Sequence, residues 1–171
     1  EQWDCHGCTA CCRETTIQLN ADDLAQLEGQ HWERQPEFQG VQTVRRSFLL
    51  GGAKVLAHKA DGSCVFLTDA GRCRIHEVFG ADAKPLMCRK FPLQVVRTDR
   101  EAVATVARSC PSAAAESGRH LSEHLLFVKR LLGDQAKPDE HAAAPPIAGR
   151  NRRGWDNFYE TAEALERLFV D

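Results

Sequence analysis

Four of the chain's eight cysteines fall within eight residues near the N-terminus. They are Cys5, Cys8, Cys11 and Cys12, in the pattern C-x2-C-x2-C-C. The adjacent Cys11 and Cys12 could hardly bridge each other without strain, because a disulfide needs Cα atoms about 4.4–6.8 Å apart. Thiolate is a soft ligand that suits zinc and iron–sulfur clusters, and a two-residue gap lets one tight turn aim two sulfurs at one metal. The segment therefore predicts a metal site.

Length and composition favour reduced thiols over a disulfide framework. The chain has 171 residues, of which 43% are hydrophobic and 27% charged, so it can bury a core without covalent staples. Disulfide scaffolds are usually shorter than about 80 residues, and clustered thiols in a reducing compartment indicate metal. We expect a cytoplasmic protein. Four disulfides in a secreted protein are the alternative that fits less well.

The charge and hydropathy of the whole chain exclude some partners. A formal net charge of −2 gives no electrostatic reason to expect nucleic acid or an anionic membrane. No run of 18 or more apolar residues is present, so no span of a bilayer is predicted. The expected partners are a metal ion or cluster and a protein partner, with no nucleic acid and no membrane.

Local patterns predict short elements of both kinds. Asn20 is typical of an N-cap for a helix that ends near Gly29. The remaining predicted elements are hairpins at Val41–Leu50 with Lys54–His58 and at Leu93–Arg97 with Ala102–Ala107, a helical turn at Glu77–Ala83, and helices at Arg119–Leu132 and Asp156–Phe169. The fold class is α+β: a small irregular metal-stabilised domain with short antiparallel hairpins and flanking helices.

Two segments are expected along the chain. Residues 1–118 form a cysteine-cluster metal-binding domain. Residues 119–171 form a C-terminal helical extension, with a linker rich in proline and alanine at 136–151.

Four further cysteines lie far from the N-terminal group and widen the predicted site. They are Cys64, Cys73, Cys88 and Cys110. Three cysteines at two-residue gaps begin the ferredoxin pattern, whose fourth ligand is followed by proline. One four-thiolate site would then consist of Cys5, Cys8, Cys11 and Cys110. A second would consist of Cys12, Cys64, Cys73 and Cys88. Zinc would accept either set, so a 4Fe-4S cluster and zinc both stay open.

An arginine directly follows three of the cysteines: Arg13, Arg74 and Arg89. A site with four thiolates carries a negative charge whether it holds zinc or an oxidised cluster. Guanidinium groups nearby would offset that charge and lower the pKa of the thiols. Ordinary surface arginines are the alternative.

The order of these cysteine blocks resembles the CxxCxxCC cysteine-cluster family, also called YkgJ-like and described as zinc- or iron-chelating. More loosely, the chain is similar to the cysteine-cluster part of flagellin lysine-N-methylases. The family resemblance implies metal ligands at all eight cysteines. It is carried by Cys5-x2-Cys8-x2-Cys11-Cys12-Arg13, Gly62-Ser63-Cys64-Val65-Phe66-Leu67, Gly71-Arg72-Cys73-Arg74-Ile75-His76 and Pro85-Leu86-Met87-Cys88-Arg89-Lys90-Phe91-Pro92, and it runs from about Trp3 to Cys110.

Histidines are secondary candidates. His6 lies inside the N-terminal cysteine group and His76 three residues past Cys73, so either could reach a metal. His120 and His124 match the short H-x-x-E-H pattern of inverted zinc peptidases, which we interpret as a solvated helix face because no third ligand is evident.

Two functions from different classes fit these observations. The first is a metal-binding protein whose cluster or zinc serves redox chemistry, sensing or a methylase-like activity. The second is a structural zinc module for protein–protein contact with no catalysis. No catalytic residue is indicated, and whether the chain is an enzyme is left open.

Overall fold

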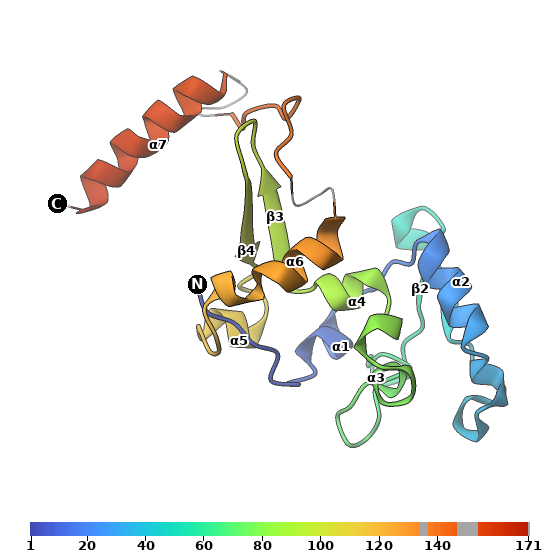
Figure 1. Ribbon diagram of the computed structural model, residues 1–171. Coiled ribbons are helices and arrows are strands. Elements are labelled where there is room, and N and C mark those ends of the chain that lie inside the picture. Colours follow the sequence, from blue (N-terminus) through green and yellow to red (C-terminus); the bar gives the residue numbers. More distant parts are fainter. Residues whose placement is uncertain (134–136, 147–153, 171) are drawn as a thin grey trace. The chain divides into compact units, whose positions relative to one another are not determined.

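The structure is a computed structural model that describes residues 1–133, 137–146 and 154–170 (Figure 1). The described chain forms two compact units. The first comprises Glu1–Leu93 and Val106–Leu121, and the second comprises Gln94–Thr105 with the described residues from Ser122 onward. Helices and two separate two-stranded hairpins confirm the predicted α+β class.

Helix α2, Ala21–Gly29, has the bounds that its sequence predicts. Asn20 is its N-cap. The Asn20 side chain accepts from the backbone N–H of Asp23 at 2.7 Å, and the Asp23 carboxylate accepts from the backbone N–H of Asn20 at 3.1 Å. This reciprocal capping box satisfies two backbone donors that a helix start otherwise leaves unpaired. Leu27 is buried on the inner face of the helix.

The first hairpin pairs β1, Val44–Ser47, with β2, Ala53–Leu56, in antiparallel register. The predicted hairpin is confirmed, but its first strand is shorter than expected. Residues Phe48–Leu50 form a 3-10 turn at the tip instead of continuing the strand. Gly51 and Gly52, both at positive φ, then turn the chain back into β2.

The core of the first unit lies between α2, the first hairpin and the segment around Phe66. Trp32 and Phe38, from two short 3-10 helices at Trp32–Arg34 and Pro36–Phe38, contact Phe66 with ring centroids 4.9 and 5.3 Å apart. Three cysteines are among the partly buried residues that pack against this core. The buried core residues are Ile17, Leu19, Leu27, Trp32, Phe38, Leu56, Ala57, Val65, Phe66 and Ile75. The partly buried residues packed on them are Leu24, Val44, Cys64, Cys73, Ala83 and Cys88.

Residues 57–73 contain little regular structure, and their only strand-like pairings are isolated bridges. His58 bridges Cys64, and Leu67 bridges Cys73. Helix α3, Arg74–Phe79, starts before the predicted turn at Glu77, because Cys73 already stands in extended backbone as its N-cap. A 3-10 turn at Ala81–Ala83 and helix α4, Leu86–Lys90, follow.

Two further short helices complete the first unit. Helix α1, Ala10–Glu14, contains Cys11 and Cys12. Helix α5, Pro111–Ala114, begins directly after Cys110, with proline at its first position, where no backbone donor is lost.

The second unit contains the second predicted hairpin and the C-terminal helices. Strand β3, Leu93–Arg97, pairs with β4, Ala102–Val106. The expected helix at Arg119–Leu132 is a 3-10 turn, Leu121–His124, followed by α6, Leu125–Leu132. His124 is buried, so the interpretation of a solvated face is wrong at that residue.

The C-terminal helix is confirmed as α7, Trp155–Val170. Residues 137–146 of the predicted linker contain no helix or strand, and its other residues, 136 and 147–151, lie outside the described residues. Asp99 and Arg100, in the turn between β3 and β4, contact α7. The Tyr159 hydroxyl donates to Asp99 at 3.1 Å, and the Arg100 guanidinium lies 4.5 Å from the Tyr159 ring centroid.

Within the described chain, no helix combines the length and the apolar character that crossing a lipid bilayer requires.

The buried carboxylate of Asp23 yields a first prediction. Besides capping α2, it accepts from the backbone N–H of Leu86 at 2.8 Å, at the start of α4. We expect Asp23→Ala to lower the free energy of unfolding by roughly 2–4 kcal/mol, because two partly buried backbone N–H groups lose their acceptor. Urea unfolding followed by circular dichroism measures the change. Asp22→Ala, the neighbouring exposed acid, is the matched control and should cost less than about 1 kcal/mol; equal losses would contradict the assignment.

Candidate metal centre

Seven of the eight cysteines line one cavity of about 500 Å³ in the first unit. They are Cys5, Cys8, Cys11, Cys12, Cys73, Cys88 and Cys110. Cys64 lines a smaller cavity of about 40 Å³, which shares Cys11, Cys12, Cys73 and Cys88 with the first. All eight cysteines are free thiols. The residues that the sequence selects as ligands are therefore brought together at two cavities with common walls.

The thiols converge without forming a finished coordination shell. Among the described residues, no three side chains of His, Cys, Asp or Glu already lie in an arrangement that could hold a metal ion. The donor set itself fits zinc or iron, since both take thiolate ligands.

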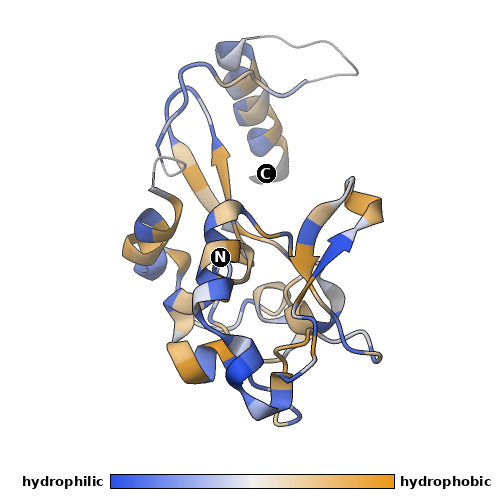
Figure 2. Cartoon of the chain, turned by 90° about the vertical axis from the view of Figure 1, so that its right-hand side faces the viewer, coloured by the Kyte–Doolittle hydropathy of each residue, from blue (hydrophilic) through white to orange (hydrophobic). Residues whose placement is uncertain are grey.

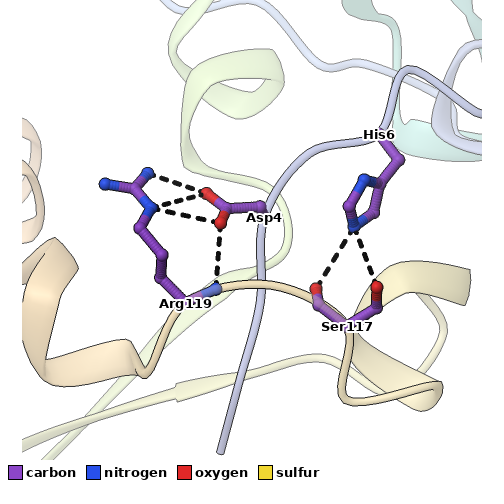
Figure 3. A network of polar contacts seen from close by, with 4 residues as sticks. All are labelled: Asp4, His6, Ser117 and Arg119. Carbon is purple, nitrogen blue, oxygen red and sulfur yellow. Dashed lines mark hydrogen bonds and ion pairs between the residues drawn. The ribbon is translucent and has the colours of Figure 1, made fainter.

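The N-terminal segment is held along residues 117–119 (Figure 3). The backbone N–H of Trp3 donates to the carbonyl of Arg119 at 2.9 Å, and that of Asp4 to the carbonyl of Ser117 at 3.0 Å. The Asp4 carboxylate pairs with the Arg119 guanidinium at 2.7 Å. His6 Nε2 lies 3.1 Å from the Ser117 hydroxyl oxygen. These contacts fix the chain on both sides of Cys5.

Gly118 allows this close approach. It has φ +128, and a Cβ atom added there would lie 2.3 Å from the backbone N of Asp4 and 2.6 Å from the backbone C of Trp3. No side chain fits between two backbones at such distances. Glycine is therefore required for the N-terminal segment to reach its position beside the cavity.

Two positive-φ residues then turn the chain into α1. Gly7 has φ +65, as expected for a tight turn between Cys5 and Cys8, and Thr9 has φ +63 at the N-cap of α1. The backbone N–H of Cys12 donates to the Thr9 carbonyl at 2.8 Å. This turn brings the exposed Cys5 and Cys8 and the half-buried Cys12 to one cavity.

Main-chain hydrogen bonds place the remaining cysteines. Cys64 donates its backbone N–H to the Cys12 carbonyl at 2.7 Å, which joins positions 52 residues apart. The backbone N–H of Arg74, next to Cys73, donates to the Phe66 carbonyl at 2.8 Å. Cys88 is carried by α4, whose first N–H is held by Asp23. Cys110 is buried at the N-cap of α5.

The thiols differ in pKa because their surroundings differ. A hydrogen bond from Cys12 lowers the pKa of Cys11 to about 6 against the effect of burial, and the positive charge of Lys84 acts in the same direction. The hydrogen bond to Cys11, followed by burial, raises the pKa of Cys12. Burial also raises the pKa of Cys64, and that of Cys88 to about 12. Among these thiols, the surroundings of Cys11 favour the thiolate form near neutral pH.

Lys84 supplies positive charge that we expected from the arginines. It lines both cavities, and its charge helps to lower the pKa of Cys11 and partly opposes the rise that burial causes in the pKa of Cys88. Arg13 instead lies 3.8 Å from Asp61, and Arg74 is paired with Glu37 at 2.8 Å. Sequence reasoning did not single out Lys84, although its place four residues before Cys88 was the available signal.

The two secondary histidines have different surroundings. His76 lines the large cavity, so it could reach a metal there. His6 lines the same cavity, but its Nε2 is engaged by both the carbonyl and the hydroxyl of Ser117.

The fold and the cysteine-lined cavity define a thiol-rich chelating domain. Residues 4–111 match the family model CxxCxxCC, described as a "putative zinc- or iron-chelating domain". Because the match covers more than half of the chain, the protein belongs to this CxxCxxCC family. Searches of curated proteins and of solved structures found no match. The metal type expected from the sequence, zinc or iron, agrees with the family description.

The close backbone contact at Gly118 can be tested by substitution. We expect Gly118→Ala to destabilise the protein by roughly 3 kcal/mol or more, because the new methyl group overlaps the backbone at Trp3 and Asp4. Gly40 is the matched control, with φ +73 and no atom within 4 Å of an added Cβ. Gly40→Ala should cost only about 1 kcal/mol. Thermal unfolding of both variants measures the difference, and similar values would contradict the contact.

The pKa contrast predicts selective alkylation. In chelator-treated protein, Cys11 should react with iodoacetamide near neutral pH, whereas Cys88 should stay unreactive until strongly alkaline pH, because only the thiolate is nucleophilic. Peptide mass spectrometry across a pH series measures each site. Lys84→Met should move the Cys11 profile to higher pH, since it removes a charge that favours the thiolate. Lys54→Met, which removes the same charge from the first hairpin, should leave the profile in place.

Proposed function

We propose that this protein binds an iron–sulfur cluster or zinc through the eight thiols at the two cavities, in a reducing compartment such as the cytoplasm. The observation that carries the proposal is the convergence of seven cysteines, from segments spread over more than 100 residues, on one cavity. An unselected chain would not gather soft ligands in this way. Membership of a zinc- or iron-chelating family supports the same conclusion.

The strongest candidates for the main ligands are the thiols that influence one another electrostatically. Cys11, Cys64 and Cys73 each affect the pKa of Cys88, and Cys11, Cys64 and Cys73 also affect that of Cys12. Mutual charge effects of this kind arise only between nearby groups. We therefore infer that four thiolates of the site come from this group of five, and that Cys5, Cys8 and Cys110 complete it or form a second site.

Two features favour the iron–sulfur form. A cavity of about 500 Å³ has more room than a single tetrahedral ion needs, and it accommodates a multi-atom cluster. The Cys64 sulfur accepts a backbone hydrogen bond from Phe66, and such bonds to sulfur tune iron–sulfur potentials. A bound cluster would supply electron transfer, and the protein would then serve redox chemistry, sensing or a methylase-associated activity.

The packing of the cysteines favours a second candidate, a structural zinc module for protein–protein interaction. Cys64, Cys73 and Cys88 pack directly on the hydrophobic core, while residues 57–73 have only isolated bridges to hold them. A metal bound by these thiols would replace missing secondary structure as the source of stability.

Metal content tests the proposal directly. Protein purified anaerobically should contain stoichiometric iron with visible charge-transfer absorption, or stoichiometric zinc without colour. Cys73→Ser should lose most of the metal because a serine hydroxyl is a poor ligand for either. Ser112→Ala, in the same cavity, is the matched control and should keep it. Protein that contains neither metal would refute the proposal, and equal metal loss in both variants would contradict the role of Cys73 as a ligand.

Metal removal measures the structural contribution. We expect chelation to lower the midpoint of thermal unfolding by several degrees or more, because metal binding free energy is available only to the folded chain. The measurement compares metal-loaded and chelator-treated protein, and restoring zinc or reconstituting the cluster should recover the midpoint. An unchanged midpoint would rule out the structural role of the metal. Metal binding itself would then be decided by the measured metal content.

A further inference from the structure

The tip of the first hairpin exposes an apolar triplet that the metal site does not explain. The side chains of Phe48 and Leu49 are 96% and 98% exposed, and Leu50 is 45% exposed. Figure 2 shows the hydrophobic colour at the tip of this hairpin. Large apolar side chains exposed side by side usually mark a binding surface, whereas single ones need no explanation.

The charge around the tip is entirely positive. Residues 38–60 contain four cations, Arg45, Arg46, Lys54 and Lys59, and no acidic residue, although the whole chain has a net charge of −2. Arg46 and Lys54 are direct partners in the β1–β2 register. Like charges placed opposite each other destabilise a hairpin, so their arrangement favours an anionic partner.

Three of these cations, Arg45, Arg46 and Lys54, are not neutralised within the described part of the chain. Arg45 contacts His58 at 3.3 Å, and Arg46 donates to the Gly52 carbonyl at 3.4 Å. Within the described residues, no ion pair involves Arg45, Arg46 or Lys54, and all three are exposed. Their charge is thus available to a partner.

We propose that the hairpin tip, Phe48–Leu50, inserts into the interface of an anionic lipid membrane, with Arg45, Arg46 and Lys54 on the phospholipid headgroups. A narrow apolar tip beside cations has the chemistry of an interfacial anchor. Three side chains are too few to form a specific protein interface, which buries about 800 Å² per partner. The anchor is independent of the proposed metal function.

Vesicle sedimentation of the full chain tests the proposal. The protein should bind vesicles of phosphatidylcholine mixed with phosphatidylserine, bind pure phosphatidylcholine far more weakly, and dissociate at high salt. F48S/L49S should reduce the partition coefficient at least about tenfold. R46Q/K54Q should reduce it roughly twenty-five-fold, because each cation near the surface contributes about fivefold. Phe48→Trp should retain binding and show a blue-shifted emission with vesicles.

Leu126→Ser is the matched control. Leu126 is 79% exposed and lies on α6 between the exposed Leu125 and Phe127. An equal or larger loss in L126S, or no preference for phosphatidylserine in the wild-type protein, would overturn the proposal. Analytical ultracentrifugation could instead show self-association that F48S/L49S abolishes, in a protein that does not bind vesicles. The tip would then contact a second copy of the chain, and the membrane proposal would also be overturned. The metal content of F48S/L49S should match wild type, so failure here is separable from failure of the metal proposal.

Discussion

The cavity depends on main-chain hydrogen bonds that tie cysteine-bearing segments to one another. The N–H of Cys64 reaches the carbonyl of Cys12 at 2.7 Å, and that of Trp3 reaches the carbonyl of Arg119 at 2.9 Å. Neither contact belongs to a hairpin of the fold. Because residues 57–73 have only isolated bridges, these few bonds decide where the thiols lie. Metal bound by the thiols would add a further cross-link in this irregular region.

Positive charge near the thiols of the cavity comes from few residues. The charge of Lys84 favours the thiolate form at Cys11 and Cys88, although burial still raises the pKa of Cys88, whereas Arg13 and Arg74 form ion pairs with carboxylates. Burial raises the pKa at most of the inner cysteines. The thiols therefore differ in how readily they lose the proton that must leave before a metal binds. Binding of a cation to the cavity would compensate the charge that burial penalises, and protons released from the protonated thiols would accompany it.

The net charge of the whole chain does not show how charged residues are distributed along it. The balance of −2 over 171 residues excludes a broadly basic protein, yet four cations and no acid fall between residues 38 and 60. Folding places Arg46 opposite Lys54 and exposes Phe48 at the tip beyond them. The cysteine-lined cavity presents soft thiols, whereas the hairpin tip presents apolar side chains beside cations. Substitutions can therefore test the two features separately.

The sequence by itself determined the features that rest on local interactions. The cysteine spacing identified a thiol site and its family, and the Asn20 cap defined α2, since the residues that form the capping box are only three apart. Only the tertiary structure decided what depends on distant contacts: which thiols share a cavity, that Lys84 is the nearby cation, that α3 starts at Arg74, and that Phe48 is exposed. Spacing along the chain carries no information on contacts between residues 12 and 64, because irregular segments can approach in many ways, and close packing selects one of them.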